Sequence, residues 1–231
     1  MPADVDLARV AGLLADQSRA RMLLAMLDGR AWTAGELARA AQIAPSTASD
    51  HLGRLVKGGL TSVVPQGRHR YYRLAGPEVA EAIEPLLQLA PREPVRNLRD
   101  SSRARTLAAA RLCYDHLAGR AGVELTDALR RRGVLAADGP ALTAEGREEL
   151  AAFGIDVATL SRRRRPLVRD CLDWTERRPH LAGAVGAALA DRLFTLGWIV
   201  RVGTARAVRI TAEGDDGLRT VFGCGPLREV A

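Results

Sequence analysis

The sequence has little of what several classes of protein require. Its 231 residues include only three cysteines, and Lys57 is the only lysine. Three cysteines are too few for a fold held together by disulfides. The longest uninterrupted apolar run, residues 181–190, is far shorter than the roughly 20 residues that span a bilayer. The N-terminus is acidic and lacks the pattern of a signal peptide, so we expect a cytoplasmic protein with no membrane partner.

Motifs that would indicate an enzyme are also missing. The chain has no G-x-x-x-x-G-K-[ST] or G-x-G-x-x-G phosphate loop, no G-x-S-x-G elbow and no H-E-x-x-H metal helix. One lysine, four histidines and no convincing pair of carboxylates leave little from which to build an active site. We therefore expect no enzyme. An enzyme acting on a small molecule in the C-terminal half is the alternative, and turnover there would reveal it.

The first 90 residues have the pattern of short helices followed by a hairpin. Thr33 with Glu36 three residues later is a capping box that opens a helix. After a short turn, a second helix is predicted over residues 45–57, with proline in its first turn and two glycines after its end. Residues 61–66 and 70–75 are rich in β-formers and predict a hairpin. Helix, tight turn, helix and two-stranded wing is the order of a winged helix-turn-helix domain.

The second helix and the wing carry the side chains expected to contact DNA. Residues 45–73 contain five Lys and Arg against one Asp, a local excess of positive charge where phosphates would lie. The predicted contacts are Gln42, Ser46, Thr47, Ser49, His51, Arg54, Arg68, His69, Arg70 and Tyr71. Base edges would be read by the outward-facing Ser, Thr and His side chains of the helix, and phosphates by the arginines. The alternative is a non-specific DNA-packaging protein, which would show no sequence preference.

Residues 14–75 closely resemble the ArsR/SmtB winged-helix repressors. The matching landmarks are D-x-x-R-x-x-x-L (Asp16, Arg19, Leu23), E-L-A (Glu36, Leu37, Ala38), S-x-x-S-x-H-L (Ser46, Ser49, His51, Leu52) and the G-R-x-x-Y-Y wing. The resemblance implies a homodimer that binds a palindromic operator in double-stranded DNA and is released by a small-molecule or metal effector. It also implies that the helix at residues 77–89 dimerises together with the first helix.

The family's two best-known metal sites are not carried over. One places cysteines directly after the E-L pair, where this chain has the sequence GELARAA. The other places Asp and His on the last helix of the domain, and residues 77–89 contain no histidine. The glutamates of that helix alone make a poor site for soft or borderline metals. An arsenic or zinc sensor of the usual kind is therefore not expected.

The C-terminal half contains an internal repeat. Residues 91–97 form a proline-containing linker after the domain at 1–90, and residues 98–231 hold two copies, at about 107–156 and 165–224. Both copies share H-L-A-G-x-x-G-x-x-L-x-x-x-L-x-x-x-G and later converge on a T-A-E-G string. We predict a mainly α-helical fold with small β-hairpins, in which a winged helix-turn-helix domain precedes two winged-helix-like repeats that sense a signal or assemble the protein.

The repeat brings cysteine and histidine to paired positions. Cys113 and His116 are three residues apart, a spacing that would place them on one face of a helix, and the second copy supplies Cys171 and His180. Together they could form a Cys₂His₂ zinc site. Two alternatives remain: ordinary core residues, since cysteine in an apolar helix is usually buried, or a thiol switch. Zinc is thus a candidate cofactor that the sequence does not require.

An organic effector is a further alternative. The second copy has the insertion WTERRP, which places Trp174 beside Arg177 and Arg178. An aromatic ring and two cations could bind an aromatic acid or another anion. A surface loop with a partly buried tryptophan is the simpler interpretation of the same residues.

Overall fold

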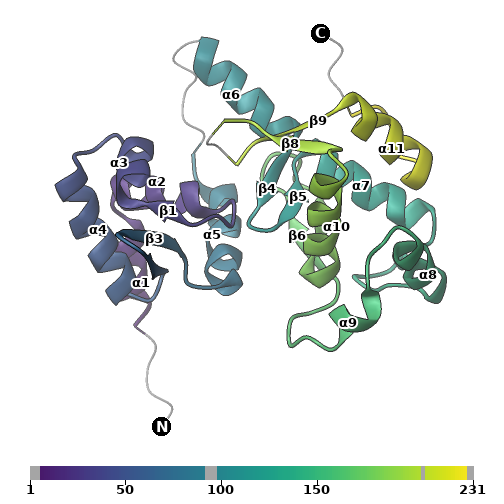
Figure 1. The fold of residues 1–231 in the computed structure, drawn as a ribbon, viewed down its shortest axis with the longest axis horizontal. Coiled ribbons are helices and arrows are strands. Elements are labelled where there is room, and N and C mark those ends of the chain that lie inside the picture. Colours follow the sequence, from purple (N-terminus) through teal and green to yellow (C-terminus); the bar gives the residue numbers. More distant parts are fainter. Residues whose placement is uncertain (1–5, 92–97, 204–205, 228–231) are drawn as a thin grey trace. The chain divides into compact units, whose positions relative to one another are not determined.

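The computed structural model describes residues 6–91, 98–203 and 206–227 (Figure 1). Contacts divide the chain into two compact units, Met1–Ile83 and Glu84–Ala231, with the boundary inside one helix. Of the predicted linker at 91–97, residues 92–97 lie outside the described part. Within the described ranges, no helix combines the length and the apolarity needed to cross a membrane.

The N-terminal unit is a winged helix-turn-helix domain. Its elements are α1 (Leu7–Leu14), α2 (Gln17–Met26), β1 (Trp32–Thr33), α3 (Ala34–Ala41), α4 (Pro45–Lys57), β2 (Thr61–Gln66), β3 (His69–Leu74) and α5 (Pro77–Leu89), the last of which crosses the boundary. The strands form an antiparallel sheet in the order β1-β3-β2. Buried Met22, Leu37, Leu52 and Leu55 from three helices form the core beneath it. The predicted fold order is confirmed, with β1 added to the predicted hairpin.

Local sequence explains the ends of the DNA-reading helices. The Thr33 hydroxyl oxygen accepts a hydrogen bond from the backbone N–H of Glu36, and the Glu36 carboxylate accepts one from the backbone N–H of Thr33. The helix α3 therefore begins with the predicted capping box. Gln42 ends α3 in the left-handed conformation (φ 59°). Pro45 then occupies the first turn of α4, where its missing N–H costs nothing.

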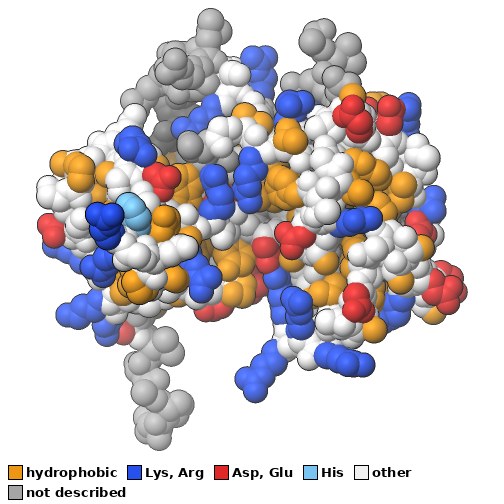
Figure 2. All heavy atoms as spheres, viewed as in Figure 1, with side chains coloured by type: hydrophobic (Ala, Val, Ile, Leu, Met, Phe, Trp, Pro, Cys, Tyr) orange, Lys and Arg blue, Asp and Glu red, His pale blue; other side chains and the backbone are white. Residues whose placement is uncertain are grey.

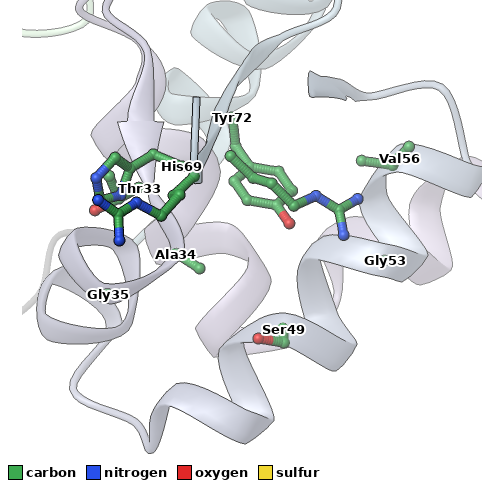
Figure 3. A pocket seen from close by; sticks show the side chains of 10 residues that line it. Thr33, Ala34, Gly35, Ser49, Gly53, Val56, His69 and Tyr72 are labelled. Atoms are coloured by element: carbon green, nitrogen blue, oxygen red, sulfur yellow. The ribbon is translucent and has the colours of Figure 1, made fainter. Parts of the chain in front are cut away.

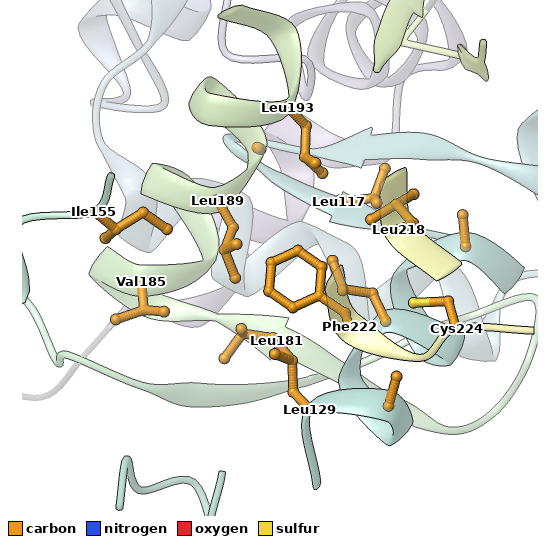
Figure 4. Packing of buried hydrophobic residues seen from close by; sticks show 14 of the residues in the cluster. Leu117, Leu129, Ile155, Leu181, Val185, Leu189, Leu193, Leu218, Phe222 and Cys224 are labelled. Carbon is orange, nitrogen blue, oxygen red and sulfur yellow. The ribbon is translucent and has the colours of Figure 1, made fainter. Parts of the chain in front are cut away.

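The C-terminal unit consists of hairpins and helices around one apolar core. Its elements are α6 (Leu98–Ala109), β4 (Arg111–Cys113), β5 (His116–Ala118), α7 (Arg120–Arg131), α8 (Ala144–Ala152), α9 (Val157–Ser161), β6 (Arg169–Leu172), β7 (Pro179–Ala182), α10 (Gly183–Thr195), β8 (Ile199–Arg201), β9 (Val208–Ile210) and α11 (Ala212–Phe222). Leu129, Leu181, Val185 and Phe222 meet in the core that Figure 4 shows, together with the sulfur-bearing side chain of Cys224.

The two sequence copies contain the same kinds of element in the same order. Each starts with a hairpin (β4–β5 or β6–β7) and continues with a helix (α7 or α10). A second pairing follows: a single bridge between Leu135 and Leu142 in the first copy, and the β8–β9 hairpin in the second. Each copy ends on a helix capped by a threonine, Thr143 or Thr211. The hairpin that precedes each first helix was not predicted.

Candidate functional site

One face of α4 presents the polar side chains expected to read DNA. Ala48, Leu52 and Leu55 are buried against the domain core, and the helical period therefore directs other positions outward. Ser46, Thr47, Ser49 and Arg54 are all exposed, as is Gln42 in the turn before the helix. The structure thus brings most of the predicted base-contacting residues together at the N-terminal end of one exposed helix.

The wing, formed by β2, β3 and the turn between them, borders the same surface. Arg68, His69 and Arg70 are exposed, and Tyr71 is half-buried with its ring 6.3 Å from that of His69. A hollow of about 520 Å³ lies between the wing and α4; its lining includes these three exposed residues, Ser49 and Gly53 (Figure 3). Figure 2 shows blue cationic side chains around a pale blue histidine on this domain. The hollow therefore has a cationic edge on its wing side.

His51 differs from the other predicted contacts. Its Nδ1 lies 3.3 Å from Nη1 of Arg19, its Nε2 lies 3.9 Å from Oδ1 of Asp16, and only 15% of its side chain is exposed. His51 follows Ala48 by three residues and precedes Leu55 by four, so it shares the edge of their buried face. The expectation that it points outward is wrong; in the structure it ties α4 to the start of α2.

In the C-terminal unit, the structure brings Cys113, His116, Cys171 and His180 together. We call these four residues the Cys/His cluster. Each offers a ligand atom, and these atoms lie within 4.8 Å of one another. Three of the residues are buried and Cys171 is half-buried. The two Sγ atoms are 3.8 Å apart, and the imidazole rings stack with their centroids 5.1 Å apart.

The cluster is built from two hairpins and not from a helix. Cys113 on β4 pairs across the ladder with His116 on β5, and Cys171 on β6 pairs with His180 on β7. The expectation of one helical face is therefore wrong, because a spacing of three also fits the two flanks of a two-residue turn. The hairpins also explain why the copies space Cys and His differently: the insertion lengthens the second loop and leaves the cross-strand pair intact.

The surroundings shift the pKa values of the two cysteines of the cluster in opposite directions. The contact with Cys171 and burial together raise the pKa of Cys113 well above its ordinary value. A hydrogen bond from Cys113 holds the pKa of Cys171 far below the usual thiol range. Burial raises this pKa, but the two imidazoles lower it further. Burial lowers the pKa of His116, but the neighbouring Asp115 and Cys171 outweigh it and raise the pKa. The cluster thus favours a thiolate beside imidazole groups.

Two aspartates that were not among the predicted site residues support the histidines. Oδ1 of Asp115 lies 3.2 Å from Nδ1 of His116, and Oδ2 of Asp173 lies 3.6 Å from Nδ1 of His180. Asp173 also pairs with the fully buried Arg111 at 2.9 Å. The signal was available in the sequence, since both copies contain C-x-D.

Each aspartate forms an ion pair with an arginine of the other copy. Arg165, which begins the second copy, binds Asp115 of the first; Arg111 of the first copy binds Asp173 of the second. Burial opposes ionisation of Asp115, but hydrogen bonds from His116 and Arg165 hold its pKa at about 2. Burial likewise opposes ionisation of Asp173, and Arg111 with nearby donors holds that pKa well below its ordinary value. Both carboxylates are therefore charged acceptors.

Helix packing also crosses between the copies. α7 packs on β7, and α10 packs on β5. A Cβ atom at Gly122 would lie 2.4 Å from the carbonyl oxygen of Leu117 and 3.7 Å from Cβ of His180; at Gly186 it would lie 2.6 Å from the carbonyl oxygen of Leu181 and 3.3 Å from Cβ of His116. The second glycine of each H-L-A-G-x-x-G string thus permits its helix to approach its own hairpin and the other copy's histidine.

The residues proposed for an organic effector have partners within the chain. The guanidinium of Arg111 lies 4.7 Å from the centroid of the Trp174 ring. Arg178 donates to Asp127 at 2.8 Å. Arg177 is exposed and has a positive φ of 55°. The cation that stacks on Trp174 is therefore Arg111, and Arg178 is engaged with a carboxylate elsewhere; binding of an organic effector there stays a prediction.

Comparison with known proteins bears on both halves of the chain. A family model described as a helix-turn-helix domain matches residues 14–64. The HTH-type transcriptional regulator YdfF of Bacillus subtilis is 44% identical over 211 residues, which is 90% of this chain and 93% of that protein. The likeness therefore extends through the C-terminal unit.

Two further likenesses cover a smaller share of the chain. The HTH-type transcriptional regulator CmtR of Mycobacterium tuberculosis is 39% identical over 83 residues, covering 36% of this chain and 70% of that protein. The NMR structure of the cadmium metal-sensor CMTR from that organism is 35% identical, covers 40% of this chain and 100% of that chain, and has a TM-score of 0.32.

Proposed function

This chain belongs to the HTH-type transcriptional regulators, with an N-terminal domain of the ArsR/SmtB kind, and from that premise we propose that it is a dimeric repressor of a palindromic operator. The observation that carries the proposal is the exposed row Ser46, Thr47 and Ser49 on α4, bordered by the cationic wing. A helix of this size fits the major groove, where hydroxyl groups can donate to or accept from base edges.

Different side chains would perform positioning and reading. Arg68 and Arg70 are exposed beside the hollow, where they can neutralise phosphates without regard to sequence. Arg54, exposed on the last turns of α4, would do the same on the other flank. Thr47 offers a hydroxyl and a methyl group, so it can read a base edge or contact a thymine methyl.

Dimerisation is supported by apolar residues left at the surface. α1 has no buried residue among those described, and Leu7 and Val10 on it are 75% and 39% exposed. The last turns of α5 also expose Leu86 and Leu89. Apolar helical faces of this kind would be covered by a second copy of the chain, whose two-fold symmetry an operator palindrome would mirror.

The effector would act on the C-terminal unit. Two candidates differ in chemistry: an organic anion near Trp174, and a metal or thiol signal at the Cys/His cluster. The structure favours the second, because the cluster gathers four ligand atoms while the guanidinium stacked on Trp174 belongs to Arg111.

The test uses a duplex selected by the full-length protein from a random-sequence pool. Arg68→Ala should weaken binding to every duplex and lower the slope of log K against log salt by about one unit. Thr47→Val should instead change which selected sequences are preferred. Arg163→Ala, an exposed arginine of the C-terminal unit, is the matched control and should leave slope and preference unchanged. An unchanged slope for Arg68→Ala would remove the wing from the proposal, and uniform weakening by Thr47→Val would remove base reading by that residue.

A further inference from the structure

The Cys/His cluster contains buried nitrogen atoms whose hydrogen-bonding needs are unmet. Among the described residues, Nε2 of His116 and both ring nitrogens of His180 have no hydrogen-bond partner, although the two side chains are 4% and 1% exposed. Buried polar atoms without partners are rare in folded proteins because each loses its bonds to water without replacement. Because one ring nitrogen of each histidine also lies within 4.8 Å of both cysteine sulfurs, the cluster indicates a missing electrophile rather than a missing hydrogen bond.

The spacing of the ligand atoms fits a tetrahedral ion. Two sulfur atoms, each ~2.3 Å from a tetrahedral Zn²⁺, lie ~3.8 Å apart. The observed separation of the sulfurs of Cys113 and Cys171 is 3.8 Å, and the full set of ligand atoms lies within 4.8 Å. Tetrahedral edges that involve nitrogen are ~3.3–3.6 Å long, so the longest observed separation would have to shorten by roughly 1.2–1.5 Å when the ion binds.

The surroundings of the histidines are those of metal ligands. A ligating imidazole usually donates its second N–H to a carboxylate, which fixes the ring orientation and raises the basicity of the bound nitrogen. Asp115 faces Nδ1 of His116, and Asp173 faces Nδ1 of His180. Nε2 of each ring is then left for the ion. Asp115 lies within hydrogen-bond distance of its histidine, whereas Asp173 is 3.6 Å from its own, just beyond that distance.

We propose that Cys113, His116, Cys171 and His180 bind one zinc-class divalent ion that joins the two copies of the C-terminal unit. Two thiolates and two neutral imidazoles around a divalent cation give a site with no net charge, which suits its burial. Metal binding needs both sulfurs as thiolates and both imidazoles neutral, so any proton on either sulfur or on a metal-facing ring nitrogen is released to solvent. Because the chain supplies all four ligands, the site has the closed form of structural metal centres.

A disulfide is a poorer interpretation of the same residues. Sulfur atoms in a disulfide are ~2.05 Å apart, so the two cysteines would have to approach by well over an ångström. A disulfide would also leave Nε2 of both imidazoles without a partner. A metal-free core cluster has that second defect too. The inference concerns the C-terminal unit alone and does not depend on operator binding.

The first measurement is the metal content of untagged, full-length protein purified without chelator. We expect about one zinc per chain and three free thiols per chain after unfolding. Protein stripped by chelator and given Co²⁺ should develop the visible bands of a tetrahedral ion and a thiolate-to-cobalt charge-transfer band. A chain with no bound metal and no such bands overturns the proposal, as does a disulfide between Cys113 and Cys171.

Variants assign the ion to the cluster. Cys171→Ser and His180→Gln should each lose the ion or weaken Co²⁺ binding by at least 100-fold. The matched controls are Cys224→Ser, at a buried cysteine in the apolar core, and His69→Gln, at an exposed histidine of the wing; both should keep full metal content. An ion that persists in Cys171→Ser and His180→Gln would lie elsewhere and overturn the assignment. Should a ligand variant not fold, the spectrum of the wild-type protein still decides between bound and absent metal.

The role of the carboxylates has its own readout. Asp115→Asn keeps a hydrogen-bond acceptor beside His116 but removes the charge, so metal affinity should fall about 10-fold to 100-fold while the ratio of one ion per chain is kept at saturation. Asp138→Asn, in the turn after α7 and away from the cluster, is the control and should leave affinity unchanged. Equal affinities for the two variants would show that Asp115 does not position His116.

Discussion

The ion pair between Glu84 and Arg206 gives a quantitative test of one buried contact within the C-terminal unit, which begins at Glu84. Nη1 of Arg206 donates to Glu84 across 122 residues of sequence, and the two side chains are only 9% and 4% exposed. The backbone carbonyl of Arg206 meanwhile accepts from the N–H of Leu112 on β4 at 2.8 Å. The pair therefore ties the second half of α5 to the strand that carries Cys113.

Removing one partner leaves the other charge buried without compensation. Such a change costs about 3–5 kcal/mol, whereas replacing both partners by uncharged residues of similar size can be nearly neutral. We therefore expect Glu84→Gln and Arg206→Met each to lower the free energy of unfolding by about 3 kcal/mol. The loss in free energy of unfolding of the double variant should be smaller than the sum of the two single losses by about 2–3 kcal/mol.

The assay is denaturant unfolding of the four proteins, followed by far-UV circular dichroism and tryptophan fluorescence. Trp174 and Trp198 report on the C-terminal unit, and Trp32 reports on the N-terminal one. Asp216→Asn breaks the pair of Arg219 and Asp216, whose side chains are 63% and 69% exposed, and should change stability much less. Additive losses in the double variant would refute the reasoning, because they would mean that the two charges do not stabilise each other.

Three further changes have expected outcomes. Leu7→Glu, at a side chain 75% exposed, should shift sedimentation from dimer toward monomer without changing the melting temperature; an unchanged dimer would exclude α1 from the interface. Gly146→Ala should destabilise the protein by about 2–3 kcal/mol, because its Cβ would lie 2.1 Å from the carbonyl oxygen of Val134. Gly53→Ala has no described atom within 4 Å of its Cβ and should stabilise α4 by up to about 1 kcal/mol. Equal effects of the two substitutions in thermal unfolding would contradict the packing argument. His51→Ala should lower stability by about 1 kcal/mol and weaken all duplexes alike; a changed base preference would show that His51 reads DNA after all.

Much of the N-terminal domain could be predicted because its signals are local. Pro45 in the first turn and Gly58 after the end give the bounds of α4, and Thr33 with Glu36 gives the start of α3. These signals act within one or two helical turns. The inward direction of His51 could not be predicted, because its partner Arg19 is 32 residues away and the helical period alone leaves an edge position undecided.

The sequence allowed the four residues of the Cys/His cluster to be predicted, but not their placement on two hairpins. Aligning the copies pairs Cys113 with Cys171 and His116 with His180. Strands of three or four residues are too short to show the alternation that distinguishes them from helix, so the hairpins were missed. Asp115 and Asp173 were overlooked because a carboxylate next to a histidine gains meaning only when the ring orientation is known.

The long loop between β6 and β7 can vary in length without changing the geometry of the Cys/His cluster. Cys171 and His180 face each other across two strands, so residues can be added or removed between them while the pair stays in register. A search for related proteins by a fixed Cys-to-His interval would therefore reject true relatives, including the first copy of this same chain. What such a search should keep is the C-x-D string, the H-L-A-G-x-x-G string and a variable interval between them.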